Sequence, residues 1–173
     1  MFWKIFVFEV KIRLSRPTLY FYFAAVFILV AFGFSTGSLP VGEKEHFNSP
    51  MLIALSSAWI SIFLMLVTSY IMGMPLYRDI EYNTKAYYLT YPISKAGYFW
   101  GRYCSSLMFV LIIASGIILG AFTGTVLGPL MGWSETARYG PNHLEYYLKP
   151  FLFIIIPNLF LHRRFFWLSC YHS

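Results

Sequence analysis

Few residues in this sequence have the type and spacing that catalysis or metal binding requires. None of the four histidines lies in an HExxH or other paired zinc-binding arrangement, and the nearest approach, His143 with Glu145, is typical of a solvated loop. Cys104 and Cys170 lack CxxC spacing. No GxxxxGK[ST] loop is present, which excludes that device for hydrolysing ATP. We therefore expect no enzymatic activity, no bound metal and no cofactor.

The composition excludes an ordinary soluble domain. Of the 173 residues, 58% are apolar and 12% are charged, whereas a soluble domain draws about a quarter of its residues from Asp, Glu, Lys and Arg. Three runs without a charged residue cover about 18–37, 51–74 and 103–128. Each is long enough for a helix to cross ~30 Å of hydrocarbon. We expect an all-α fold, that of a polytopic helical membrane protein whose transmembrane region covers residues 17–160.

A fourth apolar run, residues 151–161, ends at three basic residues, His162, Arg163 and Arg164. It is shorter than the ~17 residues that a crossing helix needs, so we interpret it as a partial span. The three full spans contain no Asp, Glu, Lys, Arg or His. Such residues mark proton relays and ion paths inside a bilayer, so their absence disfavours ion-coupled transport and intramembrane proteolysis.

The distribution of basic residues predicts the orientation. Ten of the 13 Lys and Arg residues fall in the N-terminal segment, between the second and third spans, or in the C-terminal tail. Only Lys44, Arg138 and Lys149 fall on the other side. Because cytoplasmic connections are enriched in Lys and Arg, we expect a cytoplasmic N terminus. The net charge of +6 is then an orientation signal, and we expect a lipid bilayer rather than nucleic acid as partner.

Residues 1–16 carry a helical pattern ahead of the first span. An apolar stripe at helical spacing is formed by Trp3, Phe6, Val7, Val10 and Leu14. Glu9 and Arg13 form an i,i+4 pair on another face, together with Arg16. We expect a cytoplasmic interfacial helix that bends into the bilayer at Pro17. The alternative is a frayed basic flank of the first span.

The third span carries glycines at strict four-residue spacing: Gly116, Gly120, Gly124 and Gly128. Overlapping GxxxG repeats let another helix approach closely, so this glycine seam predicts a helix-packing face. The second span adds Ser56, Ser57, Ser61, Thr68 and Ser69. Their hydroxyls can bond across helices or to their own backbone, and they identify no substrate.

The connection from 75 to 102 is too polar for burial and too aromatic for a simple loop. Its notable residues are Arg78, Asp79, Glu81, Asn83, Thr84, Pro92, Ser94 and Lys95. Pro92 suits a chain break, and Ser94 can cap a helix that runs from Lys95 through Arg102 into the third span. From these features alone, a solvated connector remains an alternative to a partner-binding segment.

At these residues the sequence resembles the permease subunits of type-two ABC exporters. In that family, acidic residues precede a G-T pair, apolar residues, P-x-S and a later G-K or G-R. The matching residues are Asp79, Glu81, Asn83 in the glycine position, Thr84, Leu89, Pro92, Ser94, Gly101 and Arg102. Asn is a reasonable substitute because it also adopts positive φ. The segments MFWKIFVFEVKIRLSRP, FNSP and YRDIEYNT are similar to bacterial permeases whose longer relatives carry a C-terminal peptidase-like domain.

The resemblance implies a six-span permease in a bacterial inner membrane, paired with a second permease subunit and two separate ATPase subunits. It also implies that Arg78 to Lys95 is the coupling element on which the ATPase docks. The partner-binding residues are then Arg78, Asp79, Glu81, Asn83, Thr84, Pro92, Ser94 and Lys95. A different class remains open, namely a membrane scaffold or assembly protein without transport activity, which would use the glycine seam as its contact face.

The tail 161–173 departs from the family pattern. It reads LHRRFFWLSCYHS, and adjacent arginines at mid-membrane would cost about 2.5–3.5 kcal/mol each. We hypothesise that this tail is read out of frame and that the chain is about half of a longer, truncated permease.

Overall fold

The computed structural model describes residues 2–39, 45–81 and 95–160. Over these ranges the backbone is helical and contains no strand, so the all-α prediction is confirmed there. The long helices are α1 (Phe2–Leu14), α2 (Pro17–Thr36), α3 (Pro50–Glu81) and α5 (Lys95–Met131). Shorter elements follow: the 3₁₀ turn η1 (Thr136–Arg138), α6 (Leu144–Pro150) and the π-helical turn η2 (Phe151–Ile155).

Three helical stretches are long and apolar enough to cross a membrane, namely Pro17–Thr36, Pro50–Ile71 and Trp100–Met131. α3 and α5 both extend beyond the uncharged runs at one end. Arg78, Asp79 and Glu81 therefore lie in the last turns of α3, and Lys95 is the first residue of α5. A helix continues as long as its backbone bonds are made, so the loss of apolar character does not end it.

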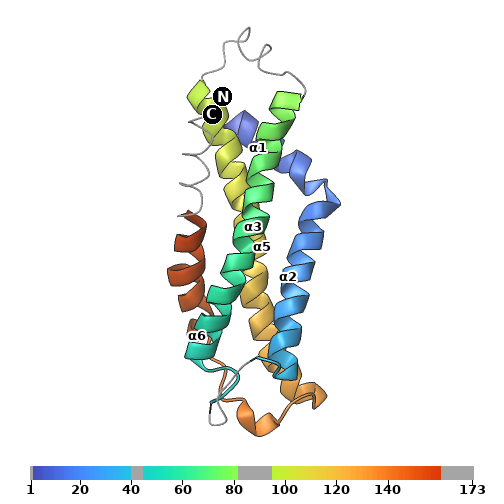
Figure 1. Cartoon of the computed structure of the whole chain (residues 1–173), viewed down its shortest axis with the longest axis vertical. Coiled ribbons are helices and arrows are strands. Elements are labelled where there is room, and N and C mark those ends of the chain that lie inside the picture. The colour runs from blue at the N-terminus through green and yellow to red at the C-terminus, as the bar shows by residue number, and fades with distance from the viewer. Residues whose placement is uncertain (1, 40–44, 82–94, 161–173) are drawn as a thin grey trace.

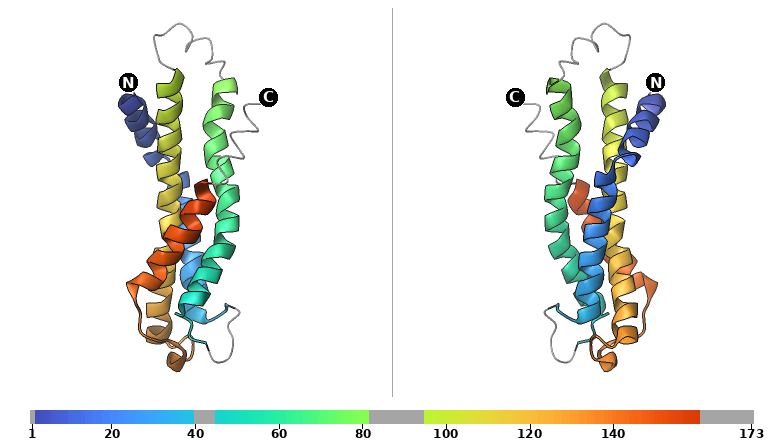
Figure 2. Two further views of the ribbon diagram at one scale, coloured as in Figure 1. Left: turned by 90° about the vertical axis from the view of Figure 1, so that its left-hand side faces the viewer. Right: turned by 90° about the vertical axis from the view of Figure 1, so that its right-hand side faces the viewer.

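The helices α2, α3 and α5 run side by side along the length of the molecule (Figure 1). α1 is inclined to them and lies beside the start of α5, at the end where α3 stops (Figure 2). We call this the α1 end. Residues 37–39, 45–50 and 131–144 lie at the opposite end of the bundle, far from α1.

α5 is the central helix of the bundle. Half of its apolar stretch is buried (50%), compared with 22% for α2. Its buried side chains, Ile113, Ile117 and Ala121 among them, pack with Val30 and Phe34 of α2 in one hydrophobic core. Burial of this face holds α2 and α5 together along most of their length.

The fourth helical segment begins at Leu144, before the apolar run that predicted it. Glu145 and Lys149 lie in its first two turns. A search for runs without charged residues therefore does not include these turns in the predicted helix. The π turn at Phe151–Ile155 is followed by helical residues 156–160, and the N–H of Ile156 donates to the carbonyl of Phe151. Pro157 has no N–H to donate to Phe153, so a wider turn just before it costs little.

Candidate functional site at the α1 end

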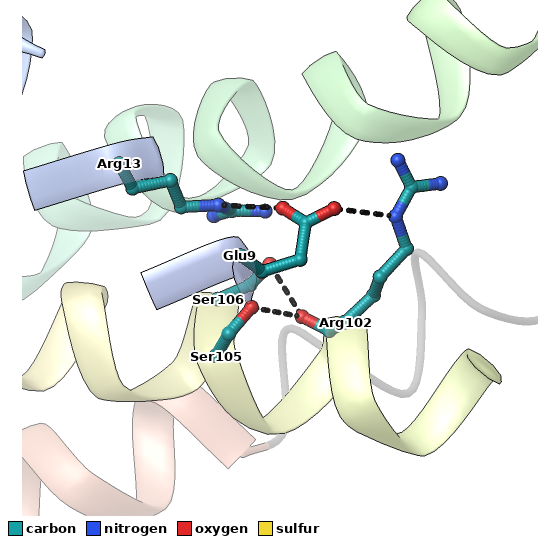
Figure 3. A network of polar contacts seen from close by, with 5 residues as sticks. All are labelled: Glu9, Arg13, Arg102, Ser105 and Ser106. Carbon is teal, nitrogen blue, oxygen red and sulfur yellow. Dashed lines mark hydrogen bonds and ion pairs between the residues drawn. The ribbon is translucent and has the colours of Figure 1, made fainter. Parts of the chain in front are cut away.

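A buried carboxylate joins α1 to α5. Glu9 is only 5% exposed, and its two oxygens point to different arginines (Figure 3). Oε1 lies 2.9 Å from Nε of Arg102 on α5, and Oε2 lies 3.5 Å from Nε of Arg13 on α1. A buried charge is tolerated only when it is paired, and here two guanidinium groups share that task.

Arg102 is itself held in place by its neighbours. The hydroxyls of Ser105 and Ser106 donate to its carbonyl oxygen at 2.8 and 3.0 Å. Its guanidinium lies 4.8 Å from the centre of the Tyr98 ring. On the other side of Glu9, the Arg13 guanidinium lies 5.7 Å from the Phe109 ring. Both cations thus combine an ion pair with a contact to an aromatic face, an arrangement that fixes their direction.

Gly101 brings the two helices into contact. A Cβ at this position would lie 3.1 Å from Cγ2 of Ile5 and 3.3 Å from the carbonyl oxygen of Phe2. These distances are shorter than ordinary van der Waals contacts, so a larger residue would push α1 away from α5. Gly101 therefore sets the helix separation, and the adjacent Arg102 makes the ion pair that the separation allows.

The sequence predicted part of this cluster. The expected Glu9–Arg13 pair is present, and α1 is an ordered helix packed on α5 rather than a frayed flank. The partner that the sequence analysis missed is Arg102, which is 93 residues away from Glu9. No periodicity within either helix could reveal that pairing, although the resemblance had singled out Gly101 and Arg102.

The apolar stripe expected on α1 is divided between two environments. Trp3 is 67% exposed, and Val7 and Leu14 are also exposed, whereas Phe6 and Val10 are half-buried. Phe8, outside the expected stripe, is 62% exposed. The charged Glu9 faces α5 and not water, because the two arginines compensate its charge. The exposed face of α1 is thus apolar and aromatic, with Lys4 and Lys11 also exposed.

The expected coupling residues fall on both sides of residues 82–94. Arg78, Asp79 and Glu81 end α3, and Lys95 begins α5, which runs unbroken through Arg102. Asn83, Thr84, Pro92 and Ser94 lie outside the described residues, as do Leu89 and the tail 161–173. The helix ends that carry the described members of the set thus lie at the α1 end of the bundle.

The glycine seam lies on the face of α5 that packs on α2. A Cβ at Gly120 would lie 2.8 Å from the carbonyl oxygen of Phe27, and one at Gly124 would lie 2.8 Å from Cβ of Phe34. At Gly128 it would meet the Tyr139 hydroxyl and the carbonyl of Ser35. Gly116 is less crowded, at 3.4 Å from the carbonyl of Phe23. The close approach of α2 therefore depends on three of the four glycines.

A network of hydrogen bonds links the helix ends opposite the α1 end, and the sequence analysis did not predict it. The Tyr139 hydroxyl donates to the carbonyl of Phe34 at 2.8 Å, where α2 has unpaired carbonyls near its end. The side chain of Asn48 bonds both the N–H and the carbonyl of Gly140. Asn142 in turn accepts from Asn48 and Tyr147, and Tyr147 bonds Thr125 of α5. This network ties the ends of α2, α3, α5 and α6 together.

Among the described residues, no group of three or more His, Cys, Asp or Glu side chains could hold a metal ion. Glu145 bonds Lys149 at 2.8 Å rather than a metal, and the His143 ring packs against Tyr146. Cys104 is a free, partly buried thiol, and Cys170 lies outside the described residues.

No protein-family model, curated protein or solved structure matches this chain.

Proposed function

We propose that this chain is the permease subunit of an ABC exporter in a bacterial inner membrane, with its N terminus in the cytoplasm. It catalyses no reaction. A separate ATPase docks on the segment 75–102, and a second permease subunit completes the pathway. The proposal continues the resemblance carried by Asp79, Glu81, Pro92 and Ser94 and by the Gly101–Arg102 pair.

The observation that carries the proposal is the Glu9–Arg102 ion pair. Arg102 lies two turns into α5, at the end of the segment on which the ATPase would dock. A force applied to that segment moves the start of α5, and the ion pair and the Gly101 contact make α1 move with it. Conformational coupling of this kind needs a rigid joint between elements rather than catalytic groups.

Large apolar side chains exposed on α2 and α3 support the membrane location. Phe21 is 70% exposed, Phe63 68% and Leu66 71%. Monomeric soluble proteins rarely expose contiguous apolar surfaces, but lipid chains cover them at no cost. Together with three helices of crossing length, this surface favours a bilayer over water.

The packing of α2 argues against the alternative of a membrane scaffold or assembly protein. Such a protein requires the glycine seam to receive a helix from a partner, but the seam is filled by α2 of the same chain. Gly120 and Gly124 face Phe27, Ala31 and Phe34 closely enough to leave no room for a second helix. This packing favours the permease proposal.

The test is association with an ATPase. The tagged chain, extracted in mild detergent from its own host, should copurify with a phosphate-loop ATPase identified by mass spectrometry. The double variant Arg78→Glu and Glu81→Lys reverses two charges where α3 ends and should lower the recovered ATPase at least tenfold. The matched control, Glu145→Lys with Lys149→Glu, reverses two charges at the opposite end and should leave recovery unchanged. Equal recovery with both double variants would remove the docking site from the proposal.

A further inference from the structure

A cavity of about 110 Å³ opens where α1 meets α2, and its lining combines charged, polar and apolar side chains. The charged and polar residues are Glu9, Arg13, Arg16 and Thr18. The apolar part of the lining consists of Ile12, Leu19, Tyr22, Tyr70, Ile71 and Phe109. We propose that this arginine cavity binds the phosphate headgroup of an anionic phospholipid. The proposal rests on the membrane location proposed above.

The charge of the cavity is positive. Its one described carboxylate, Glu9, is already opposed by Arg13 and by Arg102. The guanidinium of Arg16 forms no ion pair with any described residue and adds a further positive charge at the exposed mouth. A phosphate diester matches the planar fork of a guanidinium and would neutralise this surplus.

Backbone groups at the start of α2 add to the attraction. Arg16 is the N-cap residue of this 20-residue helix, its side chain makes no capping hydrogen bond, and Pro17 has no N–H. Thr18 and Leu19, in the same first turn, line the cavity. Their N–H groups have no partner within the helix, and the positive end of the helix dipole favours an anion there.

The apolar part of the lining favours a lipid over a soluble phosphate. The Tyr70 ring of α3 packs edge-on against the Tyr22 ring of α2, with the ring centroids 6.3 Å apart, and Ile71 and Leu19 from the same two helices also line the cavity. Further along the same two helices a second, almost wholly apolar cavity of about 310 Å³ lies between them, lined by residues such as Leu29, Leu55 and Trp59. A soluble anion gains nothing from such walls, whereas acyl chains and the glycerol backbone are covered by them.

The experiment compares lipid binding by native mass spectrometry of the full chain in detergent. Phosphatidylglycerol should bind about tenfold more tightly than phosphatidylcholine, which corresponds to ~1.4 kcal/mol. Arg16→Gln should abolish this preference. Lys11→Gln, which removes the same charge from an exposed site of α1 outside the cavity lining, should preserve it. Leu19→Trp, which fills the cavity and keeps every charge, should weaken phosphatidylglycerol binding.

Three results would overturn the proposal: equal binding of the two lipids, equal effects of Arg16→Gln and Lys11→Gln, or full competition by millimolar inorganic phosphate, which would identify a soluble anion as the ligand. The measured preference is the ratio of the affinities for phosphatidylglycerol and phosphatidylcholine. A variant that is only less stable should bind both lipids less well and leave this ratio unchanged. Loss of the ATPase from the complex leaves this ratio unchanged. A chain that stays in solution without detergent would instead contradict the proposed membrane location itself.

Discussion

Glu9 carries the most buried charge among the described residues, and its contribution to stability depends on the two arginines that pair with it. At 5% exposure the carboxylate has lost most of its water, and the Nε atoms of Arg102 and Arg13 replace it at 2.9 and 3.5 Å. Removing one member leaves the others buried and unbalanced, which costs more than the pair itself contributes. The cluster therefore reports directly on how firmly α1 is attached to α5.

Replacing Glu9 by Gln should destabilise the protein by about 3 kcal/mol, because two arginines are left without their counter-charge. For a chain of this size that corresponds to a fall in Tm of about 6–12 °C, measurable by intrinsic fluorescence in detergent. Glu135→Gln, an exposed site at the opposite end, is the control and should change Tm by less than about 1 °C. A double-mutant cycle with Arg102→Gln should return a coupling energy above about 1 kcal/mol; simple additivity would mean that the contact is not energetically significant.

Glu145 offers a contrast, because its pair is exposed. The hydrogen bond and the charge of Lys149 lower the pKa of the Glu145 carboxyl below its ordinary value. A depressed folded-state pKa contributes stability above the unfolded pKa, and the contribution is lost as pH falls through the folded pKa. We expect Lys149→Gln to raise the pKa of Glu145 in an NMR carboxyl titration. Since both side chains are largely exposed, Tm at neutral pH should hardly change.

At the scale of elements, the packing of α2 on α5 is the contact that the sequence indicated best. Four-residue glycine spacing predicted a packing face on α5, and the structure places α2 against it. The sequence alone does not determine which helix packs against the glycine seam, because each of the other predicted spans is apolar enough to do so. The helix predicted to run from Lys95 through Arg102 into the third span is confirmed, because α5 begins at Lys95. By contrast, the second uncharged run ends at residue 74, whereas α3 continues into charged turns as far as Glu81.

The contacts that the sequence did not predict are those between distant polar residues. Arg102 with Glu9, Tyr139 with Phe34 and Asn48 with Gly140 are each separated by about 90 residues or more. Local periodicity reports on one helix at a time, and such pairings depend on how helices are placed relative to one another. Nothing in the local pattern around Asn48 or Tyr139 therefore predicts these contacts.

The seam yields a graded prediction. Gly124→Ala forces a methyl group against Ala31 and Phe34 and should destabilise the protein by about 1–3 kcal/mol, despite the better helix propensity of Ala. Gly116→Ala meets Phe23 at 3.4 Å, a contact that small shifts relieve, so its stability should stay within about 1 kcal/mol of the parent. Thermal unfolding of the two variants in the same detergent makes the comparison. A loss at Gly116 equal to that at Gly124 would contradict close packing as the reason.

At the scale of the whole molecule, the two ends differ in charge and in construction. The α1 end gathers Arg13, Arg16 and Arg102 with the charged last turns of α3, while the opposite end is closed by neutral hydrogen bonds. One end therefore has the charge pattern of a cytoplasmic face. The other has a network that fixes the helix ends where no ATPase is expected to act.

This asymmetry predicts the orientation of the chain in the membrane. In a background with Cys104→Ala and Cys170→Ala, single cysteines are placed at Lys4 on α1 and at Glu135 in the opposite connection, both exposed positions. Glu135→Cys should react with a membrane-impermeant maleimide in intact spheroplasts, and Lys4→Cys only after the membrane is opened, because a cytoplasmic α1 end is shielded by the bilayer. Reaction of Lys4→Cys in intact spheroplasts would place the arginine-rich end outside, where no cytoplasmic ATPase could reach α3 and α5, and the permease proposal would then fail even if the fold stands.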